Sequence, residues 1–214
     1  MNLIHFDSIN STNEYLKENY SILEQFTFVS SAYQTSGKGR ENRLWRADKD
    51  KNLLFSFLIK NKNLLEKFKS LSIGTATLVA RFLELKGIKN VTVKWPNDVY
   101  VNNKKIAGIL LEGDVNKFLV VGVGLNVNQD IFDGEYRISP TSMKLELNKE
   151  VELEALKIEL FSFLEKHILQ KEFEKKTIKF LKDHNYLINR KVKVNGVTGL
   201  VTGIDDNFNL LIDN

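Results

Sequence analysis

Residues 91–128 read VTVKWPNDVY VNNKKIAGIL LEGDVNKFLV VGVGLNVN, and their pattern predicts a run of antiparallel strands. Valines alternate with polar residues up to Lys94, and Pro96, which cannot donate to a ladder, predicts the end of that strand. Asn102-Asn103 is a two-residue turn signal, which sets 101 opposite 104 and 100 opposite 105. Taking residues 113–116 as a four-residue loop sets 112 opposite 117 and 105 opposite 124.

This register divides the strands into two faces, because successive side chains point to opposite sides of a sheet. The face predicted to meet the core is almost wholly aliphatic: Val99, Val101, Ile106, Leu110, Val121, Val123, Leu125 and Val127. The other face is a floor with two glycines and a polar rim: Asp98, Tyr100, Lys105, Ala107, Gly122, Gly124 and Asn126.

The two glycines of this floor suggest a binding surface. Glycine inside a strand costs about 0.5–1 kcal/mol relative to alanine, and close approach of a ligand to the backbone would explain the pair. The alternative is that Gly122 and Gly124 are bulge or packing glycines and that Lys105 is a solvated edge charge.

The flanking segments complete an α+β fold. Ser11-Thr-Asn-Glu14 has the form of a helix capping box, and short alternating strands over 191–212 predict a small β-barrel. Further strands are expected at 27–33, 53–59 and 117–128, and further helices at 63–85, 153–169 and 172–187. We therefore predict a mixed or antiparallel sheet with helices packed on one face, in a domain of residues 1–188, and a small β domain of residues 189–214.

Composition narrows the class of protein. The chain of 214 residues is 43% hydrophobic and 27% charged, which is typical of a globular protein with a sizeable core. It has no cysteine, which excludes disulfides, thiolate metal sites and cysteine nucleophiles, and its three histidines are scattered. No apolar run would span a bilayer and the start is no signal peptide, so we expect a cytoplasmic protein without a membrane partner.

The loop of residues 34–51 is basic and flexible. It holds six basic residues against three acidic ones, with Gly37 and Gly39 among them, and it is predicted to close over an anion such as phosphate. A solvated basic loop is the alternative. The loop lacks the Walker A pattern, and Gly122–Asn126 lacks the third glycine of a dinucleotide fingerprint. Ser11-Thr12-Asn13 places uncharged polar groups at a helix start, where they serve either as a cap or as ligand contacts.

Taken together and in this order, five segments resemble the biotin–protein ligase family: Ser11–Asn13, Gln34–Trp45, Lys94–Asp98, Lys105–Leu110 and Val121–Asn128. Lys-Trp-Pro-Asn-Asp followed by Lys-x-Ala-Gly-Ile-Leu is the specific part. The resemblance runs from near Ser8 to the end and implies a class II synthetase-like catalytic domain with an SH3-like C-terminal domain. Longer members carry an N-terminal winged-helix repressor domain; only ten residues precede Ser11, so DNA binding is not expected.

The resemblance implies a two-step reaction. Biotin and ATP, with Mg²⁺, give biotinyl-5′-adenylate and pyrophosphate, and the biotinyl group then passes to a lysine of a biotin carboxyl carrier protein, such as that of acetyl-CoA carboxylase. Either a monomer or a homodimer is compatible with the sequence. No protein nucleophile is needed, because the carrier lysine attacks directly.

The family pattern also implies roles for individual residues. The implied catalytic residues are Lys105, Arg40 and Asp98. The implied biotin contacts are Ser11, Thr12, Asn13, Gln34, Gly37, Lys38, Gly39, Arg40, Trp95, Lys105, Gly108, Gly122 and Gly124. The implied ATP contacts are Arg40, Arg43, Trp45, Lys94, Asn97, Lys105 and Asn126, and the implied metal contacts are Asp98 and Glu112.

Two departures from the family pattern stand out. Lys38 occupies a position where the family usually has arginine, and it loses the planar fork of that side chain. No tryptophan follows Trp95, so an aromatic lid on adenine would come from Phe132, Tyr136 or another residue.

Two alternative functions stay open at this point. The nearest alternative enzyme is a lipoate–protein ligase, and the alternative from another class is a non-catalytic basic module that binds nucleic acid.

Overall fold

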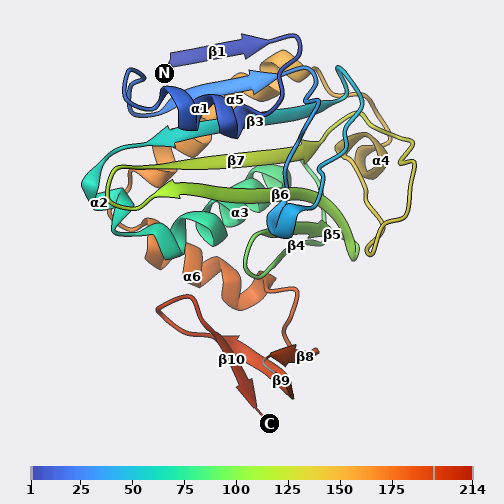
Figure 1. The fold of residues 1–214 in the computed structure, drawn as a ribbon. Helices are drawn as coiled ribbons and strands as arrows, with labels where there is room; N and C mark the ends of the chain where they lie inside the picture. The colour runs from blue at the N-terminus through green and yellow to red at the C-terminus, as the bar shows by residue number, and fades with distance from the viewer. Residues whose placement is uncertain (1, 195, 214) are drawn as a thin grey trace.

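A seven-stranded sheet forms the centre of the molecule, which is described by a computed structural model over residues 2–194 and 196–213 (Figure 1). The strand order is β1-β2-β3-β7-β6-β5-β4; β1 runs parallel to β2 and every other neighbouring pair is antiparallel. The strands are β1 (Asn2–Phe6), β2 (Thr27–Ser31), β3 (Asn52–Ile59), β4 (Val91–Lys94), β5 (Asp98–Val101), β6 (Lys104–Asp114) and β7 (Phe118–Asn126). The prediction of a mixed or antiparallel sheet is confirmed, and the sheet is mixed because of the parallel pair β1 and β2.

Helices cover both faces of this sheet rather than one. On one face lie α3 (Phe68–Leu85), α5 (Leu153–Ile168) and α6 (Phe173–His184), which bury the main core (Figure 1). On the other face lies α1 (Thr12–Asn19), whose Leu16 packs against Val29, Leu58 and Val120 in a second, smaller core. The short α2 (Lys62–Leu65) and α4 (Met143–Leu147) lie in connections. The expected one-sided packing was wrong, because the even-numbered positions near the start of β7 are also apolar.

The first hairpin has the predicted register. Tyr100 pairs with Lys105 across the Asn102-Asn103 turn, whose residues have φ of 49° and 66°, a left-handed conformation that asparagine tolerates. The second hairpin does not. Asp114 pairs with Phe118, so the loop is residues 115–117 and the register is three positions away from the predicted one.

A β-bulge keeps Lys105 on the predicted face in spite of that shift. Tyr100 pairs with Lys105 and Val99 with Ala107, so Ile106 is an extra residue in β6. Beyond the bulge the remaining residues of β6 lie on the faces opposite to those predicted, whereas β7 keeps its predicted faces, with Val121, Val123 and Leu125 in the core. Ala107 is therefore buried in the core, while Gly108 and Leu110 lie on the floor opposite Gly124 and Gly122.

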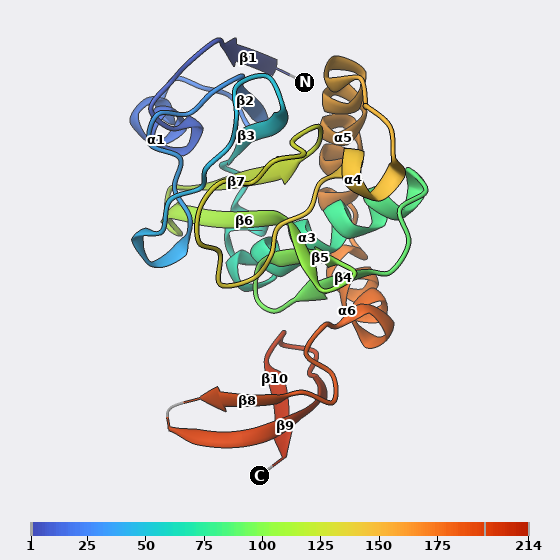
Figure 2. The same cartoon turned by 90° about the vertical axis from the view of Figure 1, so that its right-hand side faces the viewer.

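The C-terminal segment forms a second sheet beyond α6 (Figure 2). Its strands, β8 (Lys191–Val194), β9 (Val197–Ile204) and β10 (Leu210–Asp213), are antiparallel in the order β10-β9-β8. Within residues 191–194 and 196–213 the two outer strands do not pair, so the predicted β appendage is present as an open sheet. Among the described residues, none of the helices has both the length and the apolar character needed to cross a bilayer.

Candidate active site

A cavity of about 270 Å³ opens on the sheet face that carries α1. Its walls are the start of α1, the β2–β3 connection, and strands β3, β6 and β7, and Figure 1 shows that connection crossing in front of β7 and β6. Most of the residues predicted for the site line it: Ser11, Thr12, Asn13, Gln34, Lys38, Gly39, Arg40, Arg43, Trp45, Lys94, Trp95, Asn97, Asp98, Lys105, Gly108, Gly122 and Gly124. Segments from distant parts of the sequence thus meet in one cavity.

The ammonium of Lys105 lies over the glycine floor. Its Nζ is 2.8 Å from Oδ1 of Asp98 and 5.4 Å from the ring centroid of Trp45. A Cβ built on Gly108 would lie 3.2 Å from the same nitrogen. The predicted placement of Lys105 on the glycine face is therefore confirmed.

Other cations surround this ammonium and make the cavity electropositive. Burial lowers the pKa of Lys94, and the charges of Arg137, Lys105 and Arg43 lower it further, while Asp98 acts in the opposite direction. Arg40 Nη1 donates to Oδ1 of Asn97 at 3.2 Å, and the 3₁₀ turn Arg40–Asn42 places this guanidinium beside the cavity. Such a cluster favours an anionic ligand.

The glycines of the floor are required by two side chains of the protein itself. A Cβ on Gly124 would overlap the indole of Trp45, and a Cβ on Gly122 would overlap the carboxamide of Asn13. The close approach that the sequence analysis assigned to a ligand is therefore made by Trp45 and Asn13. The Nε1 of Trp45 is buried without a hydrogen-bond partner in the described part of the chain.

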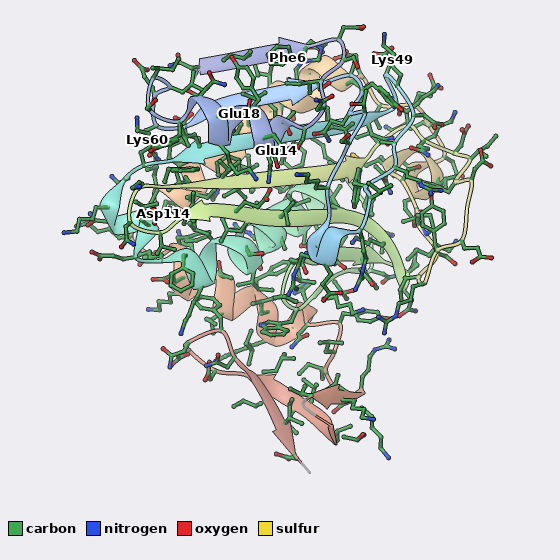
Figure 3. All side chains as sticks on the ribbon, in the orientation of Figure 1. Phe6, Glu14, Glu18, Lys49, Lys60 and Asp114 are labelled. Carbon is green, nitrogen blue, oxygen red and sulfur yellow. The ribbon has the colours of Figure 1, made fainter. Side chains whose placement is uncertain are left out.

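The start of α1 is not a capping box. Ser11 occupies the N-cap position, but its side chain accepts no hydrogen bond from the helix, and this residue lines the cavity. Glu14, labelled in Figure 3, pairs with Lys38 at 2.5 Å and with Lys17 at 2.9 Å, and these bonds, that from Lys38 first, lower the pKa of its carboxyl group. The ammonium of Lys38 is thus directed toward α1.

Neutral polar groups form the opposite end of the cavity. Thr12 donates its backbone N–H to Gln34 Oε1 at 2.8 Å, and its Oγ1 lies 2.6 Å from the hydroxyl oxygen of Ser56. Ser56 was not predicted as a site residue. Its signal was a polar residue within the apolar strand 53–59, opposite Gly122.

Several predicted residues have other partners. Asn126 donates to the carbonyl of Thr141 at 3.0 Å and, like Gly37, does not line the cavity. The indole of Trp95 borders the cavity but donates to the carbonyl of Phe208 in the C-terminal segment at 2.8 Å. Phe132 and Tyr136 contact each other edge-on and do not line the cavity either.

The two predicted metal contacts are far apart. Asp98 pairs with Gly108, four residues from Glu112 along β6, a separation of about 13 Å. Both oxygens of Glu112 are bonded, one to Asn13 and one to Lys17. Among the described residues, no group of three or more His, Cys, Asp or Glu side chains gathers where a metal could bind.

Comparisons with known proteins give a consistent result. Residues 5–128 match the model of the biotin/lipoate A/B protein ligase family. The chain is 33% identical over 149 residues to the bifunctional ligase/repressor BirA of Bacillus spizizenii, covering 66% of this chain and 46% of that protein. It is 36% identical over 102 residues to the biotin–[acetyl-CoA-carboxylase] ligase of Mycobacterium tuberculosis, covering 45% of this chain and 38% of that protein.

A solved structure matches nearly the whole chain. The biotin protein ligase from Aquifex aeolicus in complex with biotin and ATP superposes with a TM-score of 0.83 at 29% identity, covering 99% of this chain and 91% of that one. The chain spans less than half the length of the two curated relatives above.

Proposed function

Because the chain belongs to the biotin/lipoate A/B protein ligase family, we propose that it is a biotin–protein ligase that uses ATP. The observation that carries the proposal is the division of the cavity into two ends. One end gathers cations around Lys105, and the other presents neutral hydrogen-bonding groups from Thr12, Gln34 and Ser56. Biotin has the matching form, a carboxylate tail and a neutral ureido head.

In the first step a carboxylate oxygen of biotin attacks the α-phosphorus of ATP, and pyrophosphate leaves. Two like charges about 4 Å apart repel by about 1 kcal/mol in water and about 4 kcal/mol at an effective dielectric of 20. Fixed cations offset this repulsion. Lys105, Arg40, Arg43 and Lys94 all line the cavity, which supports a role for Lys105 in holding the carboxylate near the α-phosphate and a role for the other three in holding the phosphates.

In the second step the amine of the acceptor lysine attacks the acyl carbon of the adenylate, and AMP leaves. The ion pair of Asp98 with Lys105 supports a role for this carboxylate in orienting the ammonium and in accepting the proton of the attacking amine. The adenylate is a mixed anhydride that water would hydrolyse. Trp45 and several residues of the 34–45 loop line the cavity, which supports a role for them in excluding water.

Mg²⁺ fits this site only if the phosphate oxygens of ATP supply part of its ligands. It is commonly held by one or two carboxylates together with phosphate oxygens and water. Asp98 lines the cavity and is suited to one such contact, whereas Glu112 does not fit, because both of its oxygens are bonded elsewhere. When bound, the ion would neutralise phosphate charge.

Further parts of the proposal concern the whole protein. The name of the M. tuberculosis relative supports an acceptor lysine on the biotin carboxyl carrier protein of acetyl-CoA carboxylase. The break between α6, which ends at His184, and β8, which begins at Lys191, supports the domain boundary near residue 188. Four further points stay predictions: the SH3-like nature of the C-terminal domain, the cytoplasmic location, the absence of DNA binding, and the choice between monomer and homodimer.

The decisive experiment is exchange of labelled pyrophosphate into ATP, measured with biotin, with lipoate and without either acid. We expect exchange in the presence of biotin, and none with lipoate or without either acid. Lys105→Ala should reduce the rate of biotin-dependent exchange at least about a hundredfold, a ratio that corresponds to about 2.7 kcal/mol. Lys104→Ala, the exposed neighbour, is the matched control. Exchange with lipoate instead would indicate a lipoate–protein ligase, and salt-sensitive polynucleotide binding without exchange would indicate a binding module.

A further inference from the structure

A chain of hydrogen bonds leads from the cavity to two charged residues that do not line it. Nδ2 of Asn13 donates to Oε2 of Glu112 at 2.7 Å, and Nζ of Lys17 donates to Oε1 of Glu112 at 3.0 Å. On the cavity side, the Ser56 hydroxyl donates to Oδ1 of Asn13 at 2.5 Å and lies 2.6 Å from Oγ1 of Thr12. Asn13, Ser56 and Thr12 are at most 3% exposed, so water does not replace these partners.

The charged end of this chain determines the direction of every bond in it. An ionised carboxylate only accepts, so Glu112 requires the NH₂ group of Asn13 and leaves the Asn13 carbonyl oxygen toward Ser56. Ser56 has one hydroxyl hydrogen, and it is used on that oxygen. Ser56 Oγ therefore accepts the hydroxyl hydrogen of Thr12.

The result is a fixed pattern of donors and acceptors at the neutral end of the cavity. Thr12 Oγ1 also lies 3.2 Å from Oε1 of Gln34, but its single hydrogen goes to Ser56, the shorter contact at 2.6 Å, because Ser56 has no hydrogen left to donate. Thr12 Oγ1 therefore keeps its lone pairs for a ligand in the cavity that this residue lines. Oε1 of Gln34 accepts the backbone N–H of Thr12 at 2.8 Å, so the Nε2 of Gln34 is left to donate. An acceptor beside a donor matches a ligand that carries an N–H next to a carbonyl oxygen.

We propose that Glu112 and Lys17 are positioning residues that set the hydrogen-bonding polarity of the pocket for the ureido ring of biotin. This inference rests on the proposed function and assigns Glu112 a role that differs from metal binding. Lys17 donates to Oε1 of Glu112 and so keeps the other oxygen, Oε2, on the amide of Asn13. Gly122 contributes by leaving room for the Asn13 carboxamide directly above the strand.

The geometry allows a test in which the charge is moved by one residue along the chain of bonds. Asn13→Asp places a second carboxylate against Glu112 and removes the donor between them. Adding Glu112→Gln restores the pattern. The glutamine NH₂ donates to the new carboxylate at position 13, the glutamine oxygen accepts from Lys17, and the new carboxylate still accepts from Ser56. The double variant therefore differs from the native chain only in where the negative charge lies.

We expect Asn13→Asp to raise the KM for biotin at least about tenfold, equivalent to about 1.4 kcal/mol, with the KM for ATP unchanged. The double variant should return the biotin KM to within about threefold of the native value. Desthiobiotin, which keeps the ureido ring and lacks the sulfur, should show the same factors. Asp114→Asn, at the half-exposed far end of β6 (Figure 3), is the matched control and should leave both KM values unchanged.

Two results would overturn the proposal: equal losses for biotin and ATP in Asn13→Asp, or no recovery in the double variant. The thermal unfolding midpoints of the same proteins test the chain of bonds without any ligand, since Asn13→Asp should lower the midpoint and the double variant should restore it. Absence of biotin-dependent exchange in the native protein would instead contradict the proposed function and leave the unfolding result to decide the role of Glu112.

Discussion

At the scale of single residues, Gly122 and Gly124 accommodate different neighbours although they lie two positions apart on one strand. Gly122 makes room for a polar group, the Asn13 carboxamide, and Gly124 makes room for an aromatic one, the Trp45 indole. The same floor therefore carries a hydrogen-bonding area and an apolar area side by side. This division agrees with a ligand that has a polar ring and an apolar chain.

Lys94 gives a prediction about pH. Burial and the neighbouring cations lower its pKa, so its ammonium loses the proton at a lower pH than an ordinary lysine. Phosphate binding needs the protonated form, and we expect the KM for ATP to rise with pH at values below the ordinary lysine pKa of about 10.4. Lys94→Arg should remove this rise, because guanidinium stays charged. A pH profile of ATP KM that is the same for both proteins would contradict this role of Lys94.

At the scale of elements, the hairpins show how far the sequence could predict the fold. The turn at Asn102-Asn103 was predictable, since asparagine tolerates the left-handed backbone that a two-residue turn requires. The β6–β7 loop was not, because residues 113–117 contain several turn-forming residues and no unique signal. The bulge at Ile106 left no signal either, since an apolar residue there suits either register.

The candidate site, like the fold, could be predicted only in part from the sequence. Motif residues such as Lys105 and Asp98 could be found from the sequence and do meet in the cavity. The partners of Glu112 could not be found from the sequence, because its bonds to Asn13 and Lys17 join residues that are 99 and 95 positions apart. Only the fold brings those residues together.

The Asn102-Asn103 turn also gives a prediction about stability. Asn103 has φ of 66°, a conformation that costs a residue with a Cβ about 1–2 kcal/mol. We expect Asn103→Ala to be less stable than Asn103→Gly by about 1 kcal/mol in urea unfolding. Both variants lose the contact of the Asn103 side chain with Arg190, so their difference isolates the backbone effect. Equal stability of the two variants would mean that the turn does not hold this conformation.

At the scale of the whole molecule, the C-terminal segment is attached to the domain of the seven-stranded sheet beside the cavity. The ring of Phe208 is buried in the main core, and its carbonyl accepts from the indole of Trp95. Arg190 donates to Oδ1 of Asn103 at 3.0 Å, which adds a second contact to the hairpin of β5 and β6. The conformation of this sheet and the shape of the cavity wall are therefore linked through Trp95.

We expect loss of the Trp95 hydrogen bond to loosen this attachment. Trp95→Phe should speed hydrogen exchange of the β9 and β10 amides several-fold, because the attachment would open more often, and leave exchange in β3 and β7 unchanged. Trp45→Phe is the matched control, since the Nε1 of Trp45 has no partner in the described residues. Faster exchange throughout the molecule would show that Trp95 stabilises the protein as a whole.

The position of Trp45 has an optical consequence. The chain has only two tryptophans. The indole of Trp45 lies against Gly108 and Gly124, and the ammonium of Lys105 is 5.4 Å from its ring centroid. Any molecule that enters the cavity beside this ring changes the polarity around it and therefore its emission. The protein thus carries an intrinsic fluorophore at the cavity floor, with which occupancy can be titrated in a Trp95→Phe background without a label.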